Sequence, residues 1–146
     1  SSYIVDVNIK GVIYCLHYQI DAMLKYASAE NPCSIVNNSS ILSHAAYPGL
    51  TVYSATKHAV SGLTKGAALE LAESNIRVNA VGPGPIRTPM LEVPTDGHPE
   101  QFGGMVPMKR IGEPKEISDA VQWLLSTESS YVTGHTLMID GGFCSQ

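Results

Sequence analysis

The sequence predicts an α/β fold, in which a parallel sheet of about three strands is covered by helices on its faces. Segments with the apolar period of a helix alternate with short apolar segments typical of strands, in the order α-β-α-β-α-β. The strand segments are continuously apolar, as expected for parallel strands buried on both faces. With 146 residues, of which 44% are apolar and 15% charged, the chain can bury a core, and we expect residues 1–146 to form a single domain.

The first predicted helix begins at or before the start of the chain and ends near residues 29–32. Its apolar stripe steps by three and four residues and consists of Ile9, Val12, Ile13, Leu16, Ile20, Met23 and Leu24. The segment CSIVNNSS that follows, residues 33–40, is a short apolar run with β-branched residues between polar turn residues. This composition predicts the first strand.

A second helix is predicted from residue 52 onward. Its apolar and small residues keep the helical period and are Val52, Thr56, Ala59, Val60, Leu63, Ala67 and Leu71. This helix carries Tyr53 and Lys57 in its first turns. The segment IRVNAVGPG, residues 76–84, predicts the next strand, which Pro83 ends because proline cannot donate to a sheet ladder.

The segment 85–112 is rich in proline and glycine and has no sustained period. Connections of this length are usually lids or binding loops. Pro89 and Pro94 argue against a helix directly after the strand.

The third predicted helix, residues 113–126, opens with Pro114, which suits a first helical position. Its predicted buried face consists of Ile117, Ala120, Val121, Leu124 and Leu125. Trp123 is also expected in the core. The segment TLMID, residues 136–140, predicts the last strand before a Gly-Gly turn.

Composition narrows the function classes. The formal charge is −4 and there is no run of basic residues, so nucleic acid and anionic membranes are unexpected partners. No apolar run reaches the length of a membrane span. The three cysteines match neither a disulfide framework nor a zinc site, and the five histidines show no metal-like spacing. We therefore expect no metal and, with no secretory signal in the sequence, a cytoplasmic location.

Polar groups gather where the predicted strands end, which is where ligands bind in parallel sheets. Ser39 and Ser40 follow one strand, residues 82–88 end the next, and the helix with Tyr53 and Lys57 starts above the first. A free tyrosine has a pKa of about 10, and a lysine one helical turn away lowers it. This pair is a candidate general acid and base, with a serine hydroxyl to hold the substrate oxygen. Alone, the four-residue spacing of Tyr53 and Lys57 is weak evidence for catalysis, because most such pairs are exposed helix residues.

Several ordered segments raise this signal. They are VNIKG (7–11), SIVNNSS (34–40), YSATKHAVSGLTKGAALELA (53–72), IRVNAVGPGPIRTPM (76–90), KRIGEPKEI (109–117) and TGHTLMIDGG (133–142). Together they resemble the C-terminal part of a short-chain dehydrogenase/reductase. The resemblance implies a truncated, Rossmann-like, three-layer α/β fold. It also implies an enzyme that interconverts an alcohol and a ketone with NAD or NADP.

By this resemblance, Asn8, Ser40, Tyr53 and Lys57 match the catalytic tetrad of the family. Tyr53 exchanges a proton with the substrate oxygen, which Ser40 rather than Ser39 positions. Lys57 lowers the tyrosine pKa and holds the nicotinamide ribose, and Asn8 anchors a water that links the lysine to solvent. Read without the family, Asn8 only interrupts a helix or bonds to its surroundings, and Ser40 caps a turn.

The same resemblance assigns a cofactor-binding loop. Pro83, Gly84, Ile86 and Thr88 hold the nicotinamide end, Ile86 through its backbone and Thr88 through its hydroxyl. Without the family, Pro83 and Gly84 only terminate a strand.

The family's N-terminal half, with its glycine-rich turn for the pyrophosphate, has no counterpart in this sequence. The segment GPGPIRT is the nearest match but lacks the third glycine. The strand at 33–38 is then expected at an open sheet edge. Three accounts remain: a fragment of a full dehydrogenase, a short form that recovers a cofactor site by association, or a non-catalytic interaction module. The choice between NAD and NADP cannot be read from these residues.

The long segment suggests a substrate of some hydrophobic character. Its apolar residues, which we expect to close over an alcohol or ketone, are Met90, Leu91, Phe102, Met105 and Val106. In the family, the helices equivalent to residues 3–28 and 52–74 pack in oligomers. The resemblance therefore implies a homodimer or homotetramer.

Overall fold

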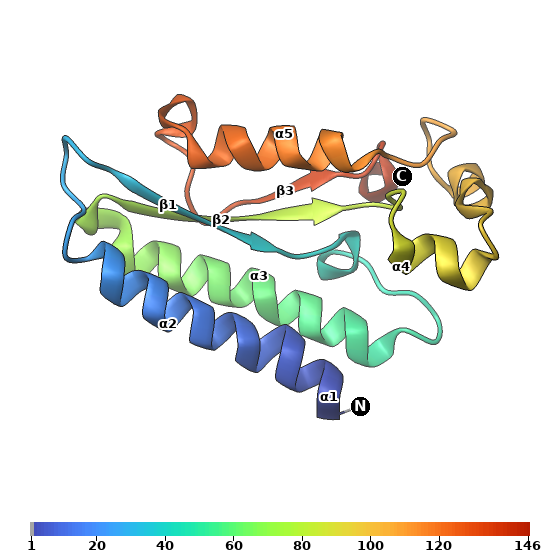
Figure 1. Cartoon of the computed structure of the whole chain (residues 1–146), viewed down its shortest axis with the longest axis horizontal. Coiled ribbons are helices and arrows are strands. Elements are labelled where there is room, and N and C mark those ends of the chain that lie inside the picture. The colour runs from blue at the N-terminus through green and yellow to red at the C-terminus, as the bar shows by residue number, and fades with distance from the viewer. Residues whose placement is uncertain (1) are drawn as a thin grey trace.

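The computed structural model describes residues 2–146 and shows three layers, a sheet with helices on either side (Figure 1). The strands are β1 (Cys33–Asn38), β2 (Ile76–Pro83) and β3 (Thr136–Ile139), all parallel and in the order β1-β2-β3. The prediction of a parallel, three-stranded α/β sheet is confirmed. As predicted, β1 lies at a sheet edge, and β3 forms the other edge.

The first helical segment changes its winding in the middle. It runs from α1 (Ser2–Val5) through a π-helical stretch (Asp6–Lys10) into α2 (Gly11–Met23). The N–H of Gly11 donates to the carbonyl of Asp6, five residues back, which is the hydrogen bond that defines a π-turn. Asn8 therefore lies in a widened turn rather than in regular α-helix.

The first helix ends at Met23, so the predicted end near residues 29–32 is wrong. The side-chain amide of Asn31 donates to the carbonyl of Tyr26 at 3.0 Å. The backbone groups of Ser28 and Asn31 bond to each other at 3.2 Å. These local polar bonds replace the helical ladder after Met23.

The long helix α3 (Thr51–Leu71) lies beside α2 on one face of the sheet (Figure 1). A 3₁₀ turn (Ala72–Ser74) and Asn75, in the left-handed region at φ 58°, reverse the chain into β2. The core cluster between these two helices and the sheet consists of Leu16, Ile35, Ala67, Ala68, Leu71, Ile76 and Val78.

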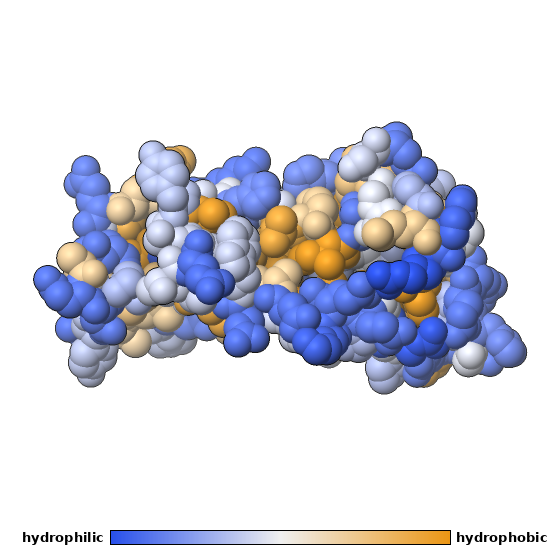
Figure 2. All heavy atoms as spheres, turned by 90° about the horizontal axis from the view of Figure 1, so that it is seen from above, coloured by the Kyte–Doolittle hydropathy of each residue, from blue (hydrophilic) through white to orange (hydrophobic). Residues whose placement is uncertain are grey.

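Helix α5 (Pro114–Leu125) covers the opposite face of the sheet (Figure 1). Leu124 is fully buried, but Trp123 and Leu125 are 38% and 50% exposed, so their placement in the core is wrong. Neighbours on a helix point about 100° apart, and a single helix on a sheet buries only a narrow stripe. Figure 2, seen from the α5 side, shows apolar surface left open between hydrophilic side chains.

The two crossover connections differ in hand. Both step in the same direction across the sheet, from β1 to β2 and from β2 to β3. The helices that they carry, α3 and α5, lie on opposite faces (Figure 1). One crossover is therefore of the uncommon left-handed kind, although about 98% of such connections are right-handed.

The connection after β2 contains short helices rather than continuous loop. These are α4 (Pro89–Glu92) and 3₁₀ turns at Val93–Thr95 and Pro99–Met105. The prediction that Pro89 and Pro94 argue against a helix here is wrong. Both prolines stand in a first helical turn, where the missing N–H leaves no bond unmade.

Candidate active site

The ends of β1 and β2 bring Ser40 beside the predicted cofactor loop. The N–H of Ser39 donates to the carbonyl of Val81 at 2.8 Å and continues the pairing of the two strands. A Cβ atom on Gly82 would lie 3.4 Å from the carbonyl oxygen of Ser40. Ser40 is therefore adjacent to the last residues of β2.

The two serines after β1 have different surroundings. The Ser39 hydroxyl donates to the carbonyl of Lys57 at 3.2 Å and lies 3.5 Å from the Ser61 hydroxyl. The Ser40 oxygen accepts from the N–H of Leu42 at 3.1 Å and caps a 3₁₀ turn, Ile41–Ser43. Within residues 2–146, the Ser40 proton has no acceptor, so Ser40 has a hydroxyl proton available for a ligand.

Lys57 is a buried cation held by the end of β1. Its side chain is only 9% exposed, and Nζ donates to the carbonyl of Asn38 at 3.0 Å. Nζ lies 5.5 Å from the centre of the Tyr53 ring. Burial lowers the pKa of Lys57 from its usual value. Sequence reasoning missed Asn38, because it acts through a backbone carbonyl that any residue type supplies.

Asn8 connects the first helix to the turn that carries Tyr53. Its side-chain amide donates to the Thr56 hydroxyl at 3.1 Å, and that hydroxyl donates to the carbonyl of Tyr53 at 2.7 Å. The sequence placed Thr56 only among the small residues of the helix face. In the sequence, only the position of Thr56 between Tyr53 and Lys57 indicated that it could support these two side chains. The water-anchoring role of Asn8 stays a prediction.

Gly84 lets β2 end close against β3. Its N–H donates to the carbonyl of Ile139 at 3.0 Å. A Cβ atom at this position would lie 2.9 Å from Cα of Asp140, closer than real side chains approach backbone. Glycine is therefore required directly after Pro83, the last residue of β2.

The backbone N–H and C=O of Ile86 make no bond to the neighbouring segment around Gly112. Gly112 donates to the carbonyl of Pro85 and accepts from the N–H of Arg87, both at 2.9 Å. Backbone groups of successive extended residues point to opposite sides, so the N–H and C=O of Ile86 point away from Gly112. The Thr88 hydroxyl donates to the carbonyl of Ile86 at 3.3 Å. This side of the loop offers hydrogen-bonding groups to a ligand.

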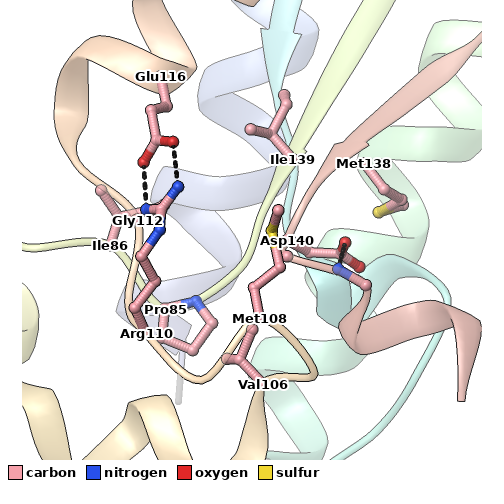
Figure 3. A pocket seen from close by; sticks show the side chains of 12 residues that line it. Pro85, Ile86, Val106, Met108, Arg110, Gly112, Glu116, Met138, Ile139 and Asp140 are labelled. Atoms are coloured by element: carbon pink, nitrogen blue, oxygen red, sulfur yellow. Dashed lines mark hydrogen bonds and ion pairs between the residues drawn. The ribbon is translucent and has the colours of Figure 1, made fainter.

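Ion pairs tie this loop to the start of α5. Arg87 binds Glu100 at 2.6 Å and Glu113 at 3.1 Å. Arg110 binds both carboxylate oxygens of Glu116, at 2.6 and 2.8 Å, beside a cavity of about 350 Å³ (Figure 3). The hydrogen bond from Arg110, with a second from the Glu113 N–H, lowers the pKa of Glu116 to about 2.

A second cavity, of about 170 Å³, lies between Ser40 and the predicted cofactor loop. We call it the Ser40 cavity. Its lining consists of Ser40, Ile41, Leu42, Tyr47, Leu50, Pro83, Gly84, Pro85, Phe102, Met105 and Phe143. Of the loop residues expected over the substrate, Phe102 and Met105 line this cavity. Met90 is instead 80% exposed, and Val106 lines the first cavity.

Within residues 2–146, no helix is both long and apolar enough to cross a membrane. In the same residues, no group of three or more histidine, cysteine, aspartate or glutamate side chains has an arrangement that could hold a metal ion.

Comparison with known proteins places this geometry in a family. A family model described as enoyl-(acyl carrier protein) reductase matches residues 2–144. Cyclohexanol dehydrogenase of Acinetobacter sp. is 38% identical over 143 residues, which are 98% of this chain and 54% of that protein. A 3-oxoacyl-[acyl-carrier-protein] reductase of Thermotoga maritima is 43% identical over 139 residues, 95% of this chain and 55% of that protein.

A solved structure also has this fold. That of ElxO with NADP bound superimposes with a TM-score of 0.86 at 37% identity, over 95% of this chain and 56% of that one. The chain thus spans about half the length of the curated relatives that it matches. The two relatives are named as a dehydrogenase and a reductase, and the solved structure has NADP bound. From the matched residues 2–144, the identities and the shared fold, this chain belongs to the short-chain dehydrogenase/reductase family.

Proposed function

We propose that this chain carries the catalytic and nicotinamide-binding part of an NAD(P)-dependent oxidoreductase that interconverts an alcohol and a ketone. One observation carries the proposal. The Lys57 ammonium is held by the Asn38 carbonyl beside the Tyr53 ring, at the strand end from which Ser40 projects. A phenol, a cation and a free hydroxyl proton at one ligand-binding edge are the groups that proton transfer to a carbonyl oxygen needs.

The residues present also suit a nicotinamide nucleotide. The Ile86 N–H and C=O and the Thr88 hydroxyl would hold the carboxamide end. Gly84 lets the start of this loop lie close against Asp140, which fixes the position of the loop. Lys57 would donate to the ribose. Bound there, the nicotinamide supplies or accepts the hydride.

In the reducing direction, Ser40 donates its hydrogen bond to the ketone oxygen and fixes its position. Tyr53 then gives its hydroxyl proton to that oxygen, and in the oxidising direction it takes the proton back. The Lys57 ammonium stabilises the negative charge left on the Tyr53 oxygen. Asn8 supports the helical turn that carries Tyr53 through its bond to Thr56. We also propose that Asn8 binds a water molecule that connects Lys57 to solvent.

Titration of the chain with NADH and with NADPH, followed by nicotinamide fluorescence, tests this function. We expect saturable binding, and the preferred nucleotide decides between the two cofactors. Thr88→Ala should weaken binding about fivefold, the worth of one hydrogen bond. Thr127→Ala, at an exposed turn far along the chain, should leave it unchanged.

Tyr53→Phe separates binding from chemistry. It should retain nucleotide binding and lose at least a hundredfold in alcohol oxidation, because the proton acceptor is gone. Failure of both nucleotides to bind at any protein concentration would contradict the proposal. That result would favour the alternative, a fragment or interaction module without a complete cofactor site.

We also propose that two copies of this chain associate through the groove between α2 and α3. This apolar groove measures about 510 Å³ and is lined in part by Ile13, Leu63, Gly62 and Gly66. We further propose a cytoplasmic location. All three cysteines are free, and thiols stay reduced in the cytoplasm.

A further inference from the structure

Resting on the proposed function, we propose that the substrate is a compact, uncharged ketone or secondary alcohol about the size of one six-membered ring. The Ser40 cavity supports this inference through its size, its lining and the position of its polar groups.

Size sets the first limit. The Ser40 cavity measures about 170 Å³. An apolar protein cavity of about 150 Å³ accommodates benzene. One ring with a carbonyl group therefore occupies the volume within this open-sided cavity, and a fused-ring skeleton would extend beyond it into solvent.

The lining sets the second limit. Its side chains are apolar except for the hydroxyls of Ser40 and Tyr47, and none of the lining residues within the described part of the chain is charged. Placing a carboxylate or phosphate there removes part of its hydration without supplying an opposite charge, and this desolvation cost weakens binding. A neutral substrate avoids this cost.

The polar groups fix the orientation. Ser40, with its unused proton, lines the same cavity as Gly84 and Pro85 of the predicted cofactor loop. A ketone oxygen bonded to Ser40 leaves the rest of the ring against Phe102, Met105 and Phe143.

The wall at Phe143 is anchored rather than loose. Asp140 accepts from the N–H of Cys144 at 2.8 Å and from the N–H of Gly142 at 2.9 Å. The Cys144 thiol lies 3.8 Å from the carbonyl of Ile41, in the turn capped by Ser40. These contacts hold the last turn, Phe143–Ser145, against the cavity, so this wall limits substrate size.

Methyl NMR tests the inference through binding, without turnover. Cyclohexanone is titrated into the chain with labelled methionine methyls, with and without NADPH. We expect the Met105 signal to shift with a millimolar Kd, since so small a ligand binds weakly. The signal of Met90, exposed in the same connection, should not move. Cyclohexanecarboxylate and acetoacetyl-N-acetylcysteamine, a linear keto thioester, should bind at least tenfold more weakly.

Variants test the size limit. Phe102→Ala should let the larger ring of cyclooctanone bind as tightly as cyclohexanone, and Met90→Ala is the matched control. No shift at Met105, or a carboxylate or keto thioester that binds as tightly as cyclohexanone, would overturn the inference. Ring binding without nucleotide binding refutes the proposed function alone. Nucleotide binding without ring binding refutes this inference alone.

Discussion

At the scale of single residues, Lys57 combines burial with a positive charge. Within residues 2–146 no carboxylate is paired with it, and its one hydrogen-bond acceptor is the carbonyl of Asn38. Burial without an opposite charge lowers the pKa of Lys57, so the charged form costs folding free energy. A residue kept at such a cost is expected where function needs the charge.

Lys57→Met should therefore stabilise the fold by about 1 kcal/mol at pH 7, because methionine keeps the apolar length and removes the charge. The folded-state pKa of Lys57 is lowered from 10.5, so the cost of the native lysine is present at pH 7, falls as the pH rises through this lowered pKa, and is gone above 10.5. The advantage of the variant should shrink over the same range. Urea unfolding at several pH values measures it, with Lys65→Met, at an exposed position of the same helix, as control. A less stable Lys57→Met protein at pH 7 would refute this account.

At the scale of elements, the start of α5 is fastened to the predicted cofactor loop. Glu116 accepts from the N–H of Glu113 at 2.8 Å in a capping box and also binds Arg110. Between these groups, Gly112 pairs with the backbone on either side of Ile86. The helix N-terminus and the loop therefore share one set of contacts.

Glu116→Gln should lower the Tm at pH 7 by about 2 °C, the modest effect of an exposed ion pair. The folded-state pKa of Glu116 is lowered from 4.5 to about 2. Its contribution is thus fully present above pH 4.5 and is lost as the pH falls toward 2. Thermal melts followed by circular dichroism should show wild type and variant converging over this range. A difference as large at pH 2 as at pH 7 would be incompatible with this explanation. Asp119→Asn, in an exposed pair on the same helix, is the control.

At the scale of the whole molecule, the groove between α2 and α3 determines the expected assembly. A Cβ atom on Gly62 or Gly66 would meet nothing within 4 Å, so this part of α3 lies open to a partner. Ile13 on the groove is 42% exposed. A second copy of the chain would cover this apolar surface.

Gly62→Arg should convert the associated form to a monomer, because a charged side chain would stand in the interface. The fold should tolerate the change, since arginine favours a helix more than glycine does. Sedimentation velocity at micromolar concentration measures the outcome. Leu69→Arg, at an 81% exposed position of α3, is the control and should still associate. A monomeric wild-type chain would contradict the proposed dimer.

The sequence was sufficient for features that depend on local spacing. Apolar periods located the three long helical segments and three strands, and Pro83 marked the end of β2, as the structure shows. Tyr53 and Lys57 share a helix face because four residues make about one turn. Helix ends and the exposure of Trp123 were predicted less well, because they depend on side-chain bonds and on how many helices cover a face.

The amino-acid sequence was thus enough to establish the α/β class, the family resemblance and the residue types gathered at one sheet edge. The tertiary structure alone decided which backbone carbonyl holds Lys57, that the Ser39 hydroxyl is occupied and the Ser40 proton free, and how large the Ser40 cavity is. It also decided that the two crossovers differ in hand. Periodicity depends only on residues that are close in the sequence. These other features depend on contacts between segments that are far apart in the sequence and pack together only in the folded chain.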